Sequence, residues 1–276
     1  MIISDKHRFV FLHIPKCAGT SVRRPLSQFN QWTEAGPPWT KGHPDLGLLD
    51  YAHIPLFVLR DYFPDAFESV RNYWSFTLLR DPFTRFASSV SERFRMYSDR
   101  PIRHRSEAEI LTSINQTIDY LSSQPRARHL LPPEYIYFQR QADYIVLDGE
   151  RVVESVYTVD EVSSLLAEVH SRVDHPWGES SITGEADGRA NAIFMFRNDL
   201  LRRAYRYTRP LTMALSMVSP DLVKQYLRAW VYVPRDQRTG PLFAADYIRE
   251  FIREYYAEDI ALYDEFRVSS DGAKGA

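Results

Sequence analysis

The stretch FVFLHIPKCAGTSV, from Phe9 to Val22, joins a run typical of a buried strand to the first turn of a helix. Between them lies a short loop with a single cation, Lys16. A helix N-terminus presents unpaired N–H groups and the positive end of the helix dipole, and Gly19 lets a ligand approach the backbone closely. The stretch therefore predicts a phosphate or sulfate site formed by Pro15, Lys16, Cys17, Ala18, Gly19, Thr20 and Ser21.

This loop differs from the nucleotide-binding P-loop, G-x-x-x-x-G-K-[ST]. Here Lys16 precedes Gly19, and no glycine stands where the P-loop has its first one. The stretch thus predicts a strand–loop–helix anion site of another kind. An ordinary strand-to-helix turn with a solvated lysine is the alternative.

Composition limits the remaining function classes. The chain has 276 residues, 44% of them hydrophobic, and a formal net charge of −2, which argues against extensive nucleic-acid binding. Cys17 is the single cysteine, so no intramolecular disulfide is possible and a cytoplasmic location is expected. Neither a signal peptide nor an apolar run long enough to span a membrane is evident in the sequence.

Hydrophobic patterning alternates strands and helices along the first part of the chain. This order predicts an α/β fold, P-loop-like and three-layered, with a central parallel sheet flanked by helices. The expected strands are Arg8 to Ile14, Tyr73 to Leu79, Ala142 to Asp148 and Val152 to Thr158, and the expected helices are Thr20 to Asn30, Ile54 to Phe63, Pro82 to Met96, Arg105 to Ser122 and Val159 to Val169. The segment Gln31 to Leu49, rich in Gly and Pro, is expected to be a loop.

The second half of the chain is expected to complete the same domain. Residues 1–268 are predicted to form one domain, of which 194–268 are a mostly helical C-terminal part. Residues 269–276 are predicted to be a disordered tail.

A second motif, FTLLRDPFTRFASSV, runs from Phe76 to Val90. It places Arg80 at the carboxyl end of a strand, where open α/β sheets bind ligands, with Arg85 and Ser88 in the following helix. An arginine and a hydroxyl form a good clamp for a terminal phosphate through charge-assisted hydrogen bonds. An Arg80–Asp81 turn with Ser88 on the helix surface is the alternative.

Taken together, H-I-P-K-C-A-G-T-S and R-D-P-x-x-R-x-x-S resemble the sulfotransferases that use 3′-phosphoadenosine-5′-phosphosulfate (PAPS). The closer resemblance is to the carbohydrate branch that includes heparan sulfate 2-O-sulfotransferase, in a soluble form like its bacterial relatives. It implies that the first loop holds the 5′-phosphosulfate, that Arg80 and Ser88 hold the 3′-phosphate, and that no metal is needed. The segment Leu200 to Pro241 does not match the family pattern.

The resemblance implies sulfuryl transfer to a hydroxyl, most simply of a sugar in a glycan, glycolipid or metabolite. Lys16 would stabilise the leaving group, and His53 matches the family histidine and would be the general base. His43 and Glu34 are the alternative bases. A small phenolic or alcoholic acceptor, an inactive nucleotide-binding scaffold and a nucleoside-triphosphate kinase are competing interpretations, and the oligomeric state stays open.

Overall fold

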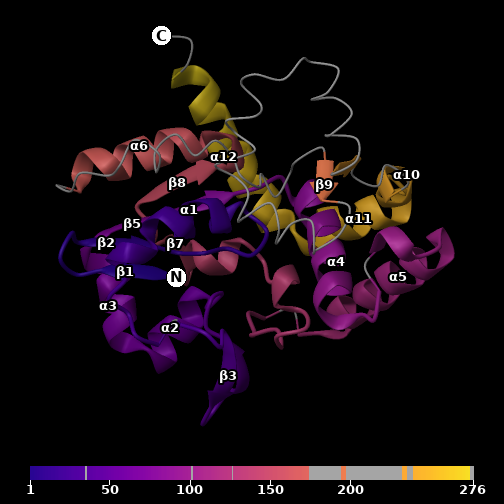
Figure 1. Cartoon of the computed structure of the whole chain (residues 1–276), viewed down its shortest axis with the longest axis horizontal. Coiled ribbons are helices and arrows are strands. Elements are labelled where there is room, and N and C mark those ends of the chain that lie inside the picture. The colour runs from indigo at the N-terminus through magenta and orange to yellow at the C-terminus, as the bar shows by residue number, and fades with distance from the viewer. Residues whose placement is uncertain are drawn as a thin grey trace. The chain divides into compact units, whose positions relative to one another are not determined.

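The computed structural model describes residues 1–34, 36–100, 102–125, 127–173, 194–196, 232–234 and 239–273. It divides into two compact units, one formed by Met1–Asp187 with Pro241–Ala276 and the other by Gly188–Gly240. The first unit is a mixed α/β structure, which confirms the predicted fold class (Figure 1).

A four-stranded sheet with the order β1-β2-β5-β8 forms the centre of the first unit. β2 pairs in parallel with β5, and β5 pairs in parallel with β8, whereas β1 pairs antiparallel with β2 and was not predicted. Every residue of β1, β2 and β5 is buried, as expected for strands covered on both faces. The strands are β1 (Ile2–Ser4), β2 (Phe9–Phe11), β5 (Trp74–Leu79) and β8 (Ser155–Thr158).

Helices cover both faces of this sheet. In Figure 1, α1 and α6 lie on one side of it and α2 and α3 on the other. A second apolar cluster joins α4, α5 and α11, with Phe86, Ile114 and Ile252 among its buried members. The helices are α1 (Gly19–Leu26), α2 (Leu56–Tyr62), α3 (Pro64–Asn72), α4 (Pro82–Tyr97), α5 (Glu107–Ser123), α6 (Val162–Arg172), α10 (Thr239–Phe243), α11 (Asp246–Tyr255) and α12 (Ala257–Ala273).

Local sequence signals place the helices of the first unit well. Asp81 caps α4 by accepting from the Thr84 N–H at 2.9 Å, and Pro82 occupies the first turn. Ser106 and Glu109 form the predicted capping box of α5. None of the helices in the described part of the chain is long and apolar enough to cross a membrane.

Two short antiparallel hairpins differ from the sequence prediction. β3 (Thr40–His43) pairs with β4 (Gly47–Asp50) inside the segment predicted to be a loop, and Gly47 adopts a φ of 69° at its turn. The predicted strand Ala142 to Asp148 is a 3₁₀ turn followed by β6 (Val146–Leu147), which pairs with β7 (Glu150–Arg151) rather than joining the main sheet.

The C-terminal half also differs in part from the prediction. β9 (Phe194–Phe196) and β10 (Tyr232–Pro234) are antiparallel strands within the region predicted to be mostly helical, whereas α10, α11 and α12 agree with it. α12 continues to Ala273, past the expected start of the tail at Ser269. Most of the unmatched segment, Leu200 to Pro241, lies outside the described residues.

Candidate active site

The two sequence motifs meet at one edge of the sheet. They follow β2 and β5, which are parallel neighbours, so their carboxyl ends lie side by side. The Leu12 N–H donates to the Phe76 carbonyl at 3.0 Å, and the Thr77 hydroxyl donates to the Leu12 carbonyl at 2.8 Å. This pairing holds the loop of the first motif beside Arg80 of the second.

The loop before α1 has an unusual backbone conformation. Lys16 and Ala18 adopt positive φ angles of 65° and 54°, in the left-handed region that non-glycine residues seldom occupy. Ala18 provides no side-chain cap for α1. Within this turn the Ser21 N–H donates to the Ala18 carbonyl at 2.9 Å, so the N–H groups of Gly19 and Thr20 are the ones that an anion could bind.

Gly19 is required by packing. A Cβ at this position would lie 1.9 Å from Cδ2 and 2.1 Å from Nε2 of His13, far closer than non-bonded heavy atoms can approach. The His13 ring is itself buried and packs against the His53 ring, with 4.3 Å between the centroids. His13 therefore lies between the start of α1 and His53, the predicted base, and contacts both.

The orientation of His53 is set by one hydrogen bond. Its Nδ1 lies 2.9 Å from the His13 carbonyl oxygen, and a carbonyl can only accept, so Nδ1 carries the proton. Nε2 of the neutral ring then has a free lone pair. Burial lowers the pKa of His53, which favours this neutral form, and the Tyr144 hydroxyl donates to the His53 carbonyl at 3.2 Å.

Of the two alternative bases, His43 is the last residue of β3 and Glu34 precedes the β3–β4 hairpin. His43 Nδ1 accepts from the Asp45 N–H at 3.2 Å, and the Glu34 carboxylate lies 3.8 Å from Lys41 Nζ. Both make these polar contacts within that region. His53, in contrast, lies against the strand that leads into the loop.

Arg80 is buried and linked to the first motif. Its Nη1 donates to the Lys16 carbonyl at 3.3 Å and its Nε to the Thr84 hydroxyl at 3.2 Å. Ser88 is half-buried on α4, two helical turns after Arg80. The structure thus places Arg80 against the predicted loop, with Ser88 on the helix that follows.

Arg85 is a support of the loop. Its side chain is 1% exposed, and its guanidinium donates to the carbonyls of Pro15 at 3.1 Å, Tyr137 at 3.3 Å and Gln139 at 2.5 Å. Its Nη1 also lies 3.8 Å from a carboxylate oxygen of Asp259. These groups engage the guanidinium, so Arg85 fixes the loop backbone through the Pro15 carbonyl. That Arg85 also contacts the donor stays a prediction.

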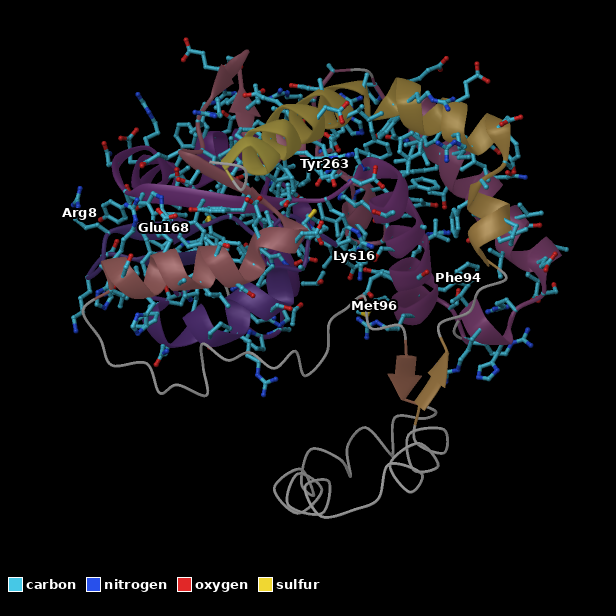
Figure 2. All side chains as sticks on the ribbon, turned by 90° about the horizontal axis from the view of Figure 1, so that it is seen from above. Arg8, Lys16, Phe94, Met96, Glu168 and Tyr263 are labelled. Atoms are coloured by element: carbon cyan, nitrogen blue, oxygen red, sulfur yellow. The ribbon has the colours of Figure 1, made fainter. Side chains whose placement is uncertain are left out.

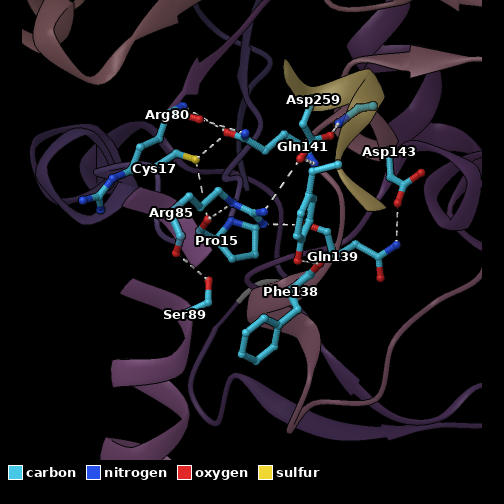
Figure 3. Close-up of polar contacts among 12 residues, drawn as sticks. Pro15, Cys17, Arg80, Arg85, Ser89, Phe138, Gln139, Gln141, Asp143 and Asp259 are labelled. Atoms are coloured by element: carbon cyan, nitrogen blue, oxygen red, sulfur yellow. Dashed lines mark hydrogen bonds and ion pairs between the residues drawn. The ribbon is translucent and has the colours of Figure 1, made fainter. Parts of the chain in front are cut away.

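Gln141 and Asp259, which the sequence analysis did not single out, connect the two motifs through buried hydrogen bonds (Figure 3). The Gln141 side-chain carbonyl accepts from the Arg80 N–H at 3.0 Å and from the Cys17 thiol at 3.0 Å. Asp259 of α12 accepts from the backbone N–H groups of Gln141 at 2.8 Å and Ala142 at 2.9 Å. A lone acid within an apolar helix face is the only sequence signal for Asp259, and Gln141 has none.

The side chains of Cys17 and Lys16 differ in their surroundings and in their chemistry. The Cys17 thiol is buried, and burial raises its pKa to about 11, so it has no exposed thiolate. Lys16 reaches α4, where its Nζ lies 2.9 Å from Glu92 Oε2. Burial lowers the pKa of Lys16, and the adjacent carboxylate opposes that effect.

The fold is that of an α/β protein, and at this edge of its sheet a strand–loop–helix turn with Lys16 lies next to the buried His13 and His53 rings. Residues 1–132, slightly less than half of the chain, match the model of the Sulfotransferase family, and they include both motifs and His53. The match indicates an enzyme that transfers sulfate. Neither the curated proteins nor the solved structures include a significant match to this chain.

Proposed function

We propose that this enzyme transfers the sulfuryl group of PAPS to a hydroxyl of a carbohydrate, with His53 as the general base. The observation that carries the proposal is the hydrogen bond between His53 Nδ1 and the His13 carbonyl, at 2.9 Å. It supports the proposal because it leaves Nε2 of a neutral imidazole as the atom that would accept the proton of the acceptor hydroxyl. A cytoplasmic location is part of the same proposal and rests on the single, buried cysteine.

The donor side of the proposal rests on the first helical turn and two side chains. The N–H groups before α1 and the Lys16 ammonium would bind the 5′-phosphosulfate, and Arg80 with Ser88 would bind the 3′-phosphate. When bound, PAPS supplies an activated sulfuryl group whose leaving group is a phosphate. Lys16, as a compact cation, would stabilise charge on that phosphate. Among the described residues, no group of three or more His, Cys, Asp or Glu side chains is arranged to hold a metal ion.

The base is tested by His53→Asn. Asparagine can still donate to the His13 carbonyl, so the packing of the loop is disturbed as little as possible. It has no equivalent of Nε2, so the proposed proton acceptor is lost. Turnover should fall by about 10²- to 10⁴-fold, while the Kd for 3′,5′-bisphosphoadenosine, measured by calorimetry, stays within about twofold of wild type because His53 does not hold the donor. His43→Asn is the matched control and should keep its rate. Wild-type turnover in His53→Asn would refute the assignment.

The donor is tested by Arg80→Met. A lost charge-assisted hydrogen bond to the 3′-phosphate should weaken binding of 3′,5′-bisphosphoadenosine about 10- to 150-fold. Binding of 5′-AMP, which has no 3′-phosphate, should change little. Equal losses for both ligands would show that Arg80 acts only through its bond to the Lys16 carbonyl.

The acceptor class is tested with radiolabelled PAPS and two panels, one of sugars and oligosaccharides and one of phenols and simple alcohols. Label should be incorporated into members of the sugar panel. Incorporation into phenols alone would replace the carbohydrate acceptor with a small metabolite.

A further inference from the structure

The cation of the anion-binding turn already has an internal partner. Lys16 Nζ and Glu92 Oε2 lie 2.9 Å apart, and both side chains are largely buried, at 19% and 15% exposure. Glu92 comes from α4, one helical turn after Ser88, and Lys16 extends toward that helix in Figure 2. Helix α4 thus carries both Ser88, proposed to bind the 3′-phosphate, and a carboxylate next to Lys16, proposed to bind the 5′-phosphosulfate.

Glu92 has a second cation that does not depend on Lys16. Arg95 donates to Oε2 through Nε at 3.2 Å and to Oε1 through Nη2. Burial alone would raise the pKa of Glu92, but the hydrogen bonds and charges of Arg95 and Lys16 lower it to about 2. The carboxylate is therefore ionised, and it keeps a bidentate partner if Lys16 leaves it.

We propose that Glu92 is a competing internal anion for Lys16, and that donor binding exchanges the Lys16–Glu92 ion pair for a contact between Lys16 and the donor. This inference rests on the proposed function, since it concerns the same donor site. In the exchange Arg95 stays on Glu92 and compensates the carboxylate. Lys16 moves from one anion to another and remains paired throughout.

The exchange is expected from the charges of the groups and from the flexibility of the lysine side chain. The donor end at Lys16 carries both a phosphate and a sulfuryl group, so an ionised carboxylate on the same ammonium opposes donor binding. A lysine ammonium is a flexible point charge on a four-carbon stem, which allows it to change partners without backbone motion. Glu92 thereby sets donor affinity through Lys16, as a positioning residue.

The test is a double-mutant cycle of Glu92→Gln and Lys16→Met, read by calorimetric titration with 3′,5′-bisphosphoadenosine. Glutamine keeps the size of Glu92 and removes its charge. In the presence of Lys16, Glu92→Gln should tighten binding about tenfold. In the Lys16→Met background the same change should tighten binding by about twofold or less, because the competition is gone.

Glu134→Gln is the matched control. Glu134 is also an acid paired with an arginine of α4, at 2.5 Å from Arg93 Nη2, and its loss changes the net charge by the same amount. Donor affinity should stay within about twofold in this variant, because Glu134 has its ion pair with Arg93 rather than with Lys16. A tenfold gain here would show a general effect of net charge and would overturn the exchange.

Three other outcomes overturn the inference. Weaker binding in Glu92→Gln would mean that Glu92 orients Lys16 for the donor. An equal gain in both Lys16 and Lys16→Met backgrounds would mean direct repulsion without exchange. Turnover lowered by about 10²-fold or more at unchanged affinity would mean that Glu92 acts in proton transfer. Wild-type protein that binds no 3′,5′-bisphosphoadenosine would instead refute the proposed function, so the two failures are distinguishable.

Discussion

Gly19→Ala is expected to damage both the stability of the protein and its donor site. A Cβ at position 19 would lie 1.9 Å and 2.1 Å from two atoms of the His13 ring. Ordinary contact between carbon atoms requires roughly 3.5–4.0 Å, so the ring or the helix must move by about 1.5–2 Å. The ring has little room to do so, because it packs between Phe11, at 5.9 Å, and His53, at 4.3 Å between centroids.

Overpacking of this kind typically costs about 1–3 kcal/mol of unfolding free energy. For a chain of this size each kcal/mol lowers Tm by about 2–4 °C, so Gly19→Ala should lower Tm by about 2–12 °C. Donor affinity should fall as well, since the displaced backbone belongs to the turn that we propose binds the donor. Thermal unfolding followed by circular dichroism, with calorimetric binding of 3′,5′-bisphosphoadenosine, measures both effects.

Gly36→Ala is the control, because a Cβ at Gly36 meets no atom within 4 Å and should change the unfolding free energy by no more than about 0.5 kcal/mol. A second control is the His13→Ala background, in which the clash partner is absent and Gly19→Ala should cost much less. A Tm for Gly19→Ala within a degree of wild type, or an equal loss in the His13→Ala background, would refute the packing argument.

Three further predictions follow from buried groups near the site. Arg85→Met should lower the unfolding free energy by about 3–5 kcal/mol in urea titrations, because it leaves Asp259 and three carbonyls without their cation. Wild-type stability of this variant would contradict a role of Arg85 in holding the loop. Cys17 should react with iodoacetamide at pH 8 at least about 100-fold more slowly in the native protein than in urea, because burial raises its pKa to about 11, and equal rates would exclude a buried thiol. Burial raises the pKa of Asp143 to about 6 from 3.8, so the folded state binds this proton more tightly than the unfolded chain and stability should fall as pH rises from about 4 to 6. Urea midpoints measured across that range should show this slope in wild type and a flatter one in Asp143→Asn.

Much of the α/β core was predictable because its signals are local. Strand β5 is a mostly apolar run whose residues are all buried, Asp81 and Pro82 mark the start of α4, and Ser106 with Glu109 marks the start of α5. Each signal acts within a few residues through hydrogen bonds and backbone preferences. The parallel order of β2 and β5 then brings both motifs to one edge of the sheet. The sequence did not predict three short elements: the hairpins β3–β4 and β6–β7 and strand β1. Strands of so few residues show no clear alternation of apolar and polar side chains.

The roles of individual side chains depend on partners far away in the chain. Sequence spacing placed Arg85 and Ser88 on the helix of the second motif, but only packing decides that the Arg85 guanidinium is enclosed by carbonyls more than 50 residues away. Gln141 reaches Arg80 across 61 residues, and Lys16 reaches Glu92 across 76. Local sequence therefore determined where the strand–loop–helix turn that we propose binds an anion, and a candidate base, occur along the chain. The tertiary structure decided which side chains are free to bind, because burial forces every charged group to find a partner and those partners come from distant segments.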